Sequence, residues 1–123
     1  MTELHQKDLS YQVVGCAMRV HAMLGPGFPE SIYHRALVRE LLENKIPFHS
    51  EKVAEVYYKD TLCGEFRMDI VVADSIVLEL KALDAINTVH MAQALSYLKA
   101  TGLRLAIIIN FGTKSLETKR VVL

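Results

Sequence analysis

The sequence has few of the residues that mark disulfide-rich or metal-thiolate proteins. It contains two cysteines, Cys16 and Cys63, three prolines and no tryptophan in 123 residues. The cysteines lie far apart and form neither a CxxC pair nor the ligand spacing of a zinc site. We expect two thiols in a reducing cytoplasm, and the sequence alone leaves their pairing open.

An excess of charge of one sign is also absent, and so is any long apolar run. Lysine and arginine together number 14, as do aspartate and glutamate. Without a global positive field, affinity for nucleic acid would need a local basic face. Charges interrupt the apolar runs well before membrane length, and no signal-peptide pattern precedes the first helix. These absences predict a cytoplasmic protein with no membrane contact.

Length and apolar content are those of a folded domain. At 123 residues and 51% hydrophobic content, the chain suits a single domain over residues 1–123 with one core. Apolar residues at helical spacing predict a helix over about 9–24, which ends at the glycine-rich turn 25–27. A second helix is expected over about 30–44, directly after Pro29.

The rest of the chain predicts a mixed sheet. Strands are expected at 53–58, 62–72 and 76–83, then a helix from Asn87 or Thr88 to about residue 100, and strands at 103–111 and 116–123. Because a strand-helix-strand connection is usually right-handed and parallel, the 103–111 strand should lie parallel to the 76–83 strand. The predicted fold class is α/β of the α+β type. A mixed central sheet is flanked by helices, in the order α-α-β-β-β-α-β-(β).

Three charged side chains interrupt two of the apolar strands. Asp69 lies in one, and Glu79 and Lys81 end the next, in the pattern D-x9-E-x-K. Burying them is costly unless they are paired or hold a metal. Side chains alternate along a strand, so Glu79 and Lys81 share a face, and Asp69 on a neighbouring antiparallel strand can converge with Glu79 on one cation. Hard oxygen ligands suit Mg²⁺ or Mn²⁺ and predict phosphodiester hydrolysis. A plain salt-bridge cluster is the alternative.

Two helices carry further polar candidates. Glu30 and Tyr33 lie three residues apart on one helical face, and Gln93 and Tyr97 form an i,i+4 pair on the helix after the charged strands. Gln93 and Tyr97 are expected to hold phosphate or to orient the lysine. Three of the four candidates also have a structural explanation: Glu30 complements a helix dipole, Tyr33 fits a core with a hydrated hydroxyl, and Gln93 suits any exposed helix.

Five segments stand in order along nearly the whole chain: Gly27-x-x-Glu30-x-x-Tyr33, Gly64-Glu65-Phe66-Arg67-Met68-Asp69, Glu79-Leu80-Lys81-Ala82, His90-x-x-Gln93-x-x-x-Tyr97, and Ile109-Asn110-Phe111-Gly112. Together they resemble the GxxExxY family, which belongs with the PD-(D/E)xK nuclease superfamily. One departure is that Met68 stands where the superfamily usually has proline before the first aspartate.

The resemblance implies a restriction-endonuclease-like α-β-β-β-α-β core with a metal site. The implied metal ligands are Asp69, Glu79 and the Leu80 carbonyl, and Lys81 would position or activate the attacking water. Glu30 would contact the metal through water. The Gln-xxx-Tyr element of the RecB-like branch of the superfamily is matched by Gln93 and Tyr97. The expected substrate-binding residues are therefore Tyr33, Gln93 and Tyr97.

The sequence thus predicts a Mg²⁺- or Mn²⁺-dependent nuclease that acts on DNA, with RNA as the alternative substrate. A compact chain without an appended specificity domain leaves substrate choice to a partner or a homodimer. Two other functions fit the same fold. One is a non-catalytic nucleic-acid-binding or regulatory module, and the other is a structural homo-oligomer whose charged cluster is an interface salt bridge.

Overall fold

The computed structural model describes residues 3–123, which form three helices and five strands. In chain order these are α1 (Glu3–Leu24), α2 (Glu30–Glu43), β1 (Phe48–Tyr58), β2 (Thr61–Val72), β3 (Ile76–Lys81), α3 (Thr88–Thr101), β4 (Leu105–Asn110) and β5 (Glu117–Val122). The order is the predicted one, and the final strand, which the sequence left optional, is present. The predicted mixed α+β fold class is confirmed.

The five strands form one sheet in the order β1-β2-β3-β4-β5. β3 and β4 are parallel, as predicted for strands joined by a helix, and the other three pairings are antiparallel. The parallel register places Lys81 beside Asn110. The carboxyl ends of β3 and β4 therefore meet at one end of the sheet.

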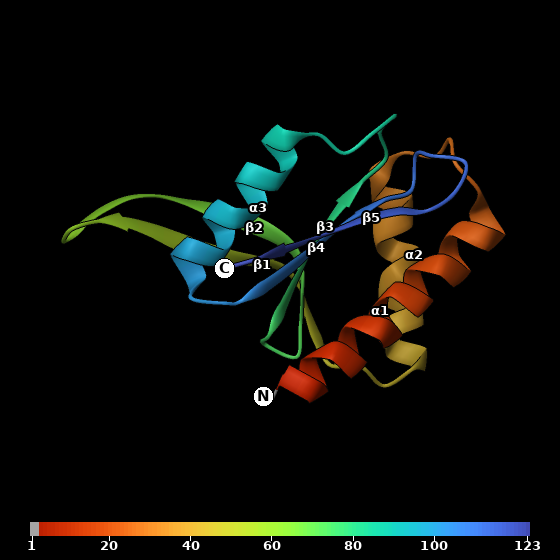
Figure 1. Cartoon of the computed structure of the whole chain (residues 1–123), viewed down its shortest axis with the longest axis horizontal. Coiled ribbons are helices and arrows are strands. Elements are labelled where there is room, and N and C mark those ends of the chain that lie inside the picture. Colours follow the sequence, from red (N-terminus) through yellow and green to blue (C-terminus); the bar gives the residue numbers. More distant parts are fainter. Residues whose placement is uncertain (1–2) are drawn as a thin grey trace.

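Helices cover both faces of the sheet (Figure 1). α1 and α2 pack on one face, in a core that includes Val13, Leu37, Leu78 and Ile107. α3 packs on the other face, in a core that includes Val77, Ala94, Leu98 and Ile108. Because β3 and β4 are buried on both faces, their sequences are nearly continuous apolar runs. A charged residue within either strand is consequently held inside the protein.

The ends of α3 follow the signals in the sequence. The Asn87 side chain accepts a hydrogen bond from the His90 N–H at 3.0 Å, and the His90 ring accepts one from the Asn87 N–H at 3.1 Å. This reciprocal cap satisfies two backbone donors at the start of the helix. Gly102 ends the helix with a left-handed φ of 78°, which glycine adopts without steric cost.

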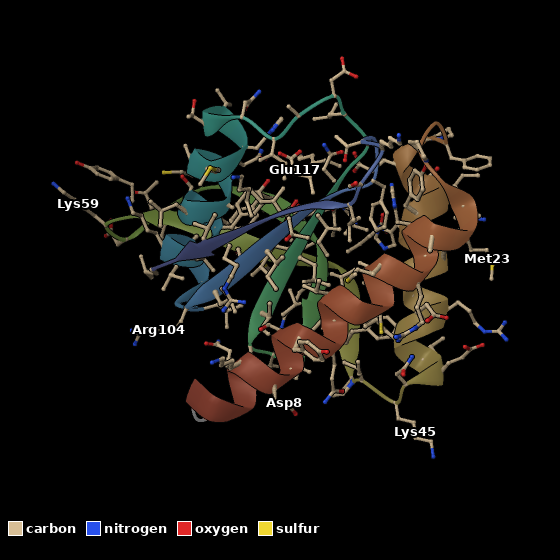
Figure 2. The ribbon with its side chains drawn as sticks, turned by 45° about the vertical axis from the view of Figure 1, so that its right-hand side comes forward. Asp8, Met23, Lys45, Lys59, Arg104 and Glu117 are labelled. Carbon is tan, nitrogen blue, oxygen red and sulfur yellow. The ribbon has the colours of Figure 1, made fainter. Side chains whose placement is uncertain are left out.

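Some element boundaries differ from the predicted ones. α1 begins at Glu3, earlier than expected, and β1 begins at Phe48 rather than at Val53. β1 is longer because Phe48 pairs with Val72 at the far end of β2, so long-range pairing rather than local pattern decides where the strand starts. The β1–β2 hairpin projects from the body of the protein, with Lys59 near its tip (Figure 2).

Both cysteines are free thiols, with Cys16 buried and Cys63 exposed. None of the described helices has the length and apolar character needed to cross a membrane.

Candidate active site

Asp69 lies where the pairing between β2 and β3 stops. The antiparallel pairing runs from Val72 to the pair formed by Ile70 and Leu78. Two residues after Leu78 in β3, the Leu80 N–H donates a hydrogen bond to Asp69 Oδ2 at 2.7 Å. A side-chain oxygen thus replaces a backbone carbonyl as the partner of β3. Because a charged acceptor makes a strong hydrogen bond, this contact fixes the Asp69 carboxylate against β3.

Glu79 is a buried carboxylate with an unsatisfied oxygen. The residue is 6% exposed, and its Oε1 has no hydrogen-bond partner among residues 3–123. Burial, and after it the charge of Asp69, raises the pKa of Glu79 to about 8, while a backbone hydrogen bond from Asp69 and the charge of Lys81 oppose the rise. The two carboxylates are close enough to repel each other. A cation would offset the repulsion and satisfy the free oxygen.

Lys81 lies on the same face of β3 as Glu79. Side chains alternate along a strand, and Val77 packs in the core under α3, so Glu79 and Lys81 also point to the α3 side. The charge of Lys81 lowers the pKa of Glu79, so the ammonium lies near that carboxylate. Within the described chain, however, no ion pair shorter than 4.0 Å involves Lys81. The cluster is therefore not a closed salt bridge.

Glu30 reaches the same region from the first residue of α2. Burial, followed by the charge of Asp69, raises the pKa of Glu30, whereas Lys81 and His34 lower it. The residue is exposed, so it stands at the solvent side of the carboxylate pair. The charge of Asp69 thus acts on Glu30 of α2 as well as on Glu79 of β3, although these residues are widely separated in the sequence.

α3 supplies a tyrosine on the other side of the carboxylate pair. Burial raises the pKa of Tyr97, and the charges of Glu79 and then Asp69 raise it further. The Tyr97 ring stacks on Phe66 of β2 with the centroids 4.1 Å apart. Gln93 lies one helical turn earlier and is exposed, so its amide is free to meet a ligand from solvent. The structure places Tyr97 beside the carboxylates and Gln93 at the surface next to it.

Tyr33 does not lie at the site. Its side chain is fully buried, stacks on Phe111 with the centroids 4.7 Å apart, and donates a hydrogen bond to the Gly25 carbonyl at 2.5 Å. The Phe28 N–H donates to the same hydroxyl at 3.1 Å. The expected substrate contact of Tyr33 is therefore corrected: a ring without exposed surface and with a satisfied hydroxyl holds the α1–α2 loop in place.

The sequence analysis assigned no role to Asn110, which organises the chain just after Lys81. Asn110 is fully buried, and its amide oxygen accepts hydrogen bonds from the Leu83 N–H at 2.9 Å and the Gly112 N–H at 3.0 Å. Its amide nitrogen donates to the Leu83 carbonyl and to Glu117 Oε1, both at 3.0 Å. A buried amide with four partners fixes the backbone between β3 and α3. The sequence signals were a polar residue at the end of an apolar strand and its place in the segment Ile109-Asn110-Phe111-Gly112.

Glu117 and Gly112 complete this backbone clamp. Glu117 Oε1 also accepts a hydrogen bond from the Ile86 N–H at 3.0 Å, and the residue lies beside the chain between β3 and α3 (Figure 2). The hydrogen bond with Asn110 lowers the pKa of Glu117. A Cβ at Gly112 would approach the Leu83 backbone to 2.4 Å, so only glycine allows the two segments to pack this closely.

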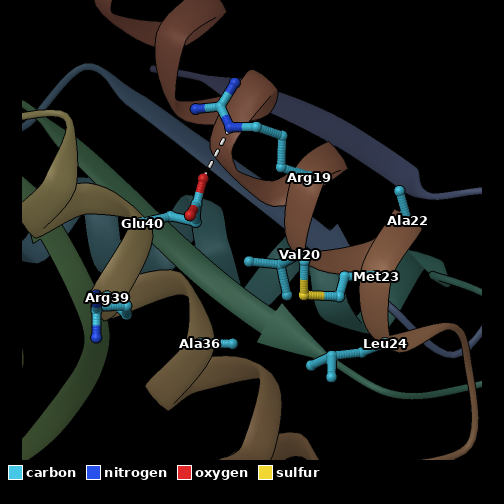
Figure 3. Close-up of a pocket in the computed structure, with 8 residues that line it drawn as sticks. All are labelled: Arg19, Val20, Ala22, Met23, Leu24, Ala36, Arg39 and Glu40. Atoms are coloured by element: carbon cyan, nitrogen blue, oxygen red, sulfur yellow. Dashed lines mark hydrogen bonds and ion pairs between the residues drawn. The ribbon is translucent and has the colours of Figure 1, made fainter.

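An apolar pocket of about 560 Å³ lies elsewhere, between α1 and α2 (Figure 3). Its lining includes Val20, Met23, Leu24 and Ala36. The Arg19 Nε donates to Glu40 Oε1 at 2.7 Å at this pocket, so its one carboxylate is already paired. None of the predicted site residues lines it, and its surface is mostly apolar.

A family model described as the PD-(D/E)XK nuclease superfamily matches residues 7–121. The chain belongs to the PD-(D/E)XK nuclease superfamily. The crystal structure of SSO0001 is similar, with a TM-score of 0.58 and 18% identity, over 76% of this chain and 50% of that one. An alkaline exonuclease from Laribacter hongkongensis gives a TM-score of 0.41 and 13% identity, over 69% of this chain and 51% of that one.

The likeness to SSO0001 shows a shared fold, and the chain spans about half the length of these two solved structures. A comparison with curated proteins found no match.

PD-(D/E)XK nucleases generally use divalent metals, and this chain has a donor set that fits such an ion. Asp69 and Glu79 supply carboxylate oxygens, one of them without a partner. The Lys81 carbonyl accepts from the Phe111 N–H on the β4 side. Because successive carbonyls alternate between the two edges of a strand, the Leu80 carbonyl faces the β2 side, where Asp69 lies. Among residues 3–123, no three His, Cys, Asp or Glu side chains are arranged so that they could hold one metal ion together. Two carboxylates and a carbonyl are thus the candidate ligands.

Proposed function

We propose that this chain is a metal-dependent nuclease of the GxxExxY branch that hydrolyses phosphodiester bonds in DNA. The observation that carries the proposal is the unsatisfied Glu79 Oε1, buried beside Asp69 and on the same face of β3 as Lys81. A buried, unpartnered and strongly perturbed carboxylate has no structural benefit, and such groups concentrate at functional sites.

Each side chain has a separate part in the proposed reaction. A divalent cation supplies charge neutralisation at the phosphate and a more acidic water when it is bound. Asp69 and Glu79 hold that cation, and the Leu80 N–H keeps the Asp69 carboxylate from rotating away. Lys81 orients the attacking water and stabilises negative charge that develops on the phosphate. Glu30, on the solvent side, holds a second water at the site.

α3 supplies the proposed contacts to the substrate. The Tyr97 ring is locked by its stack on Phe66, so its hydroxyl keeps a fixed position near the carboxylates. Gln93 is exposed one turn earlier and can donate its amide N–H groups to a phosphate oxygen. Tyr33, which is buried, has no part in this proposal.

The structural alternative, an Asp-Glu-Lys salt bridge, predicts contacts that the described residues do not make. A salt bridge stabilises a buried carboxylate only when the partner ammonium contacts it. Instead, burial and repulsion from Asp69 outweigh the influence of Lys81, and the pKa of Glu79 is raised. This balance supports a site prepared for a cation over a closed ion-pair cluster.

The proposal also includes a cytoplasmic location and a Mg²⁺ or Mn²⁺ cofactor. The free thiols of Cys16 and Cys63 support a reducing compartment. Substrate choice is assigned to a partner or to a second copy of the chain, because balanced charge gives this chain little general attraction for a polynucleotide.

A cleavage assay tests the proposal. Single- and double-stranded DNA and RNA are incubated with the protein in Mg²⁺, in Mn²⁺ and in EDTA, with Asp69→Asn as the inactive control. We expect cleavage of DNA only with metal. Preferential cleavage of RNA would show that RNA, rather than DNA, is the substrate. Metal-independent binding without cleavage of any substrate would instead support the nucleic-acid-binding module.

A further inference from the structure

A second pocket, of about 450 Å³ and with a mixed polar and apolar lining, lies between α2 and β1. It is lined by Ser31, His34, Arg35 and Val38 of α2 and by Ser50 and Glu51 of β1. The four α2 residues follow the spacing of one helical face, so they present one continuous wall. The lining carries a guanidinium, an imidazole, two hydroxyls and one carboxylate.

This pocket borders the carboxylate site through β1. Ser50 pairs with Ile70 of β2, and Lys52 pairs with Met68, so Glu51 stands opposite Asp69. Glu51 has a positive φ of 54°, and it is not paired with Asp69 in the antiparallel register of β1 and β2. A left-handed conformation is unfavourable for a residue other than glycine. The β1–β2 ladder is therefore broken at the position that faces the candidate metal site.

The pocket also borders the site through α2. His34 is close enough to Glu30 for its charge to influence that carboxylate, and Glu30 is influenced in turn by Asp69 and Lys81. A ligand in the pocket would thus lie on the Glu30 side of the carboxylate pair.

The donors in the pocket suit a phosphate group. His34 Nε2 and Ser50 Oγ are hydrogen-bonded at 2.8 Å, so both are already turned toward each other across the pocket. Arg35 is exposed and makes no hydrogen bond or ion pair with any described residue. A free guanidinium beside hydroxyl and imidazole donors matches the oxygens of a phosphate.

We propose that this pocket binds a phosphodiester group of the polynucleotide adjacent to the one that is cleaved. The inference rests on the proposed nuclease function. The Glu51 carboxylate selects the charge state of the ligand, because it offsets part of the Arg35 charge. A dianionic terminal phosphate is attracted more strongly than a monoanionic diester by Arg35 but also repelled more strongly by Glu51, so it gains little, while its desolvation costs more. The backbone of the nucleic acid, rather than its phosphorylated end or free phosphate, is the expected ligand.

Amide chemical-shift mapping of the metal-free protein tests the inference without relying on cleavage. The probes are a short unphosphorylated oligothymidylate, thymidine 5′-monophosphate and inorganic phosphate. The oligonucleotide should shift the amides of Ser31, Arg35 and Ser50 at lower concentration than the other two probes. Stronger binding of the monophosphate or of inorganic phosphate would overturn the assignment to a diester.

Two charge variants and a matched control sharpen the test. Arg35→Gln should weaken oligonucleotide binding by about tenfold, as expected when a charged hydrogen bond is lost. Glu51→Gln should strengthen it and reduce the preference for the diester. The control is Arg39→Gln, which changes net charge equally on the same helix, outside this pocket. Equal losses in Arg35→Gln and Arg39→Gln would show a general charge effect and overturn the proposal.

Failure of this inference is distinguishable from failure of the proposed function. A protein that cuts DNA with metal, but whose Arg35→Gln variant binds like the parent, would refute the phosphodiester pocket alone. A protein that never cuts, yet shows the Arg35-dependent shifts, would refute the nuclease and leave the pocket as a nucleic-acid contact.

Discussion

Asn110 and Glu117 share a hydrogen bond of 3.0 Å that ties the end of β4 to the start of β5. Through the same two side chains, the backbone of Leu83 and Ile86 is held in place directly after Lys81. The site therefore has two parts: the charged side chains of β2 and β3, and a polar clamp around the buried Asn110 that fixes the chain where β3 ends. Because all the hydrogen-bonding groups of the buried Asn110 amide are paired, the local structure is rigid.

The hydrogen bonds of Asn110 predict that one small substitution strongly lowers the stability of the protein. Asn110→Asp exchanges an amide donor for a carboxylate that faces the Leu83 carbonyl and Glu117, so we expect a loss of about 3 kcal/mol in unfolding free energy. Glu117→Gln keeps an acceptor oxygen and should cost about 1 kcal/mol or less. Urea denaturation measures both. Equal stability of Asn110→Asp and the parent would contradict the clamp.

The raised pKa of Glu79 predicts that metal-free protein loses stability as pH rises. Its value in the folded protein is about 8, against 4.5 ordinarily. Between these values the folded state binds more protons than the unfolded state, so the free energy of unfolding falls with increasing pH. The fall should reach a few kcal/mol, since one pKa unit corresponds to about 1.4 kcal/mol.

Urea melts in EDTA across this pH range, on the parent and on Glu79→Gln, provide the measurement. Glu79→Gln cannot titrate at this position and should show a much flatter profile. A parent whose stability rises over the same range would mean that Glu79 is ionised in the folded protein.

Asp69→Asn separates a metal site from a salt bridge. Above pH 8, where Glu79 is ionised, removing one of two repelling carboxylates should leave the metal-free protein as stable as the parent or more stable. The introduced amide retains an oxygen for the Leu80 N–H. If the cluster were a buried salt bridge, the same change would cost about 3–5 kcal/mol.

Thermal melts with EDTA and with Mn²⁺ decide between these outcomes. Mn²⁺ should raise the melting temperature of the parent by mass action and have little effect on Asp69→Asn. A strongly destabilised variant, together with a parent that does not respond to metal, would contradict the proposed metal site.

Lys81→Ala should abolish cleavage and leave Mn²⁺ binding largely intact, because an ammonium is not a cation ligand and acts on the water or the developing charge. Titration calorimetry beside the cleavage assay separates the two quantities. Lys99→Ala on α3 removes the same charge from an exposed position and serves as the control. Unchanged cleavage in Lys81→Ala would count against the assigned role.

Tyr97→Phe and Gln93→Ala test the contacts from α3. Tyr97→Phe keeps the stack on Phe66 but lacks the hydroxyl, and Gln93 is exposed, so both variants should melt close to the parent temperature. We expect each to lower turnover or substrate affinity about tenfold, the effect of one lost hydrogen bond to a charged group. Normal activity with a large loss of stability would instead assign both residues to the core.

The sequence by itself determined the order of elements and drew attention to Asp69, Glu79 and Lys81. Both results depend on local pattern: apolar periodicity distinguishes helix from strand, and a charge within an apolar run is visible without knowledge of its neighbours. The alternation of side chains also sufficed to predict Glu79 and Lys81 on one face, and β3 keeps this alternation, with Val77 in the core under α3 and Leu78 and Leu80 in the core under α1 and α2.

Only the tertiary structure decided how the other candidates divide between site and core. Tyr33 and Glu30 are three residues apart on one helix, yet Phe111 stacks on the first and the charge of Asp69 raises the pKa of the second. The role of Asn110 was equally invisible, since its partners include Leu83. In each case the deciding contact joins residues that are distant in the sequence. Burial depends on which other elements pack against a side chain, and a local sequence pattern does not contain that information.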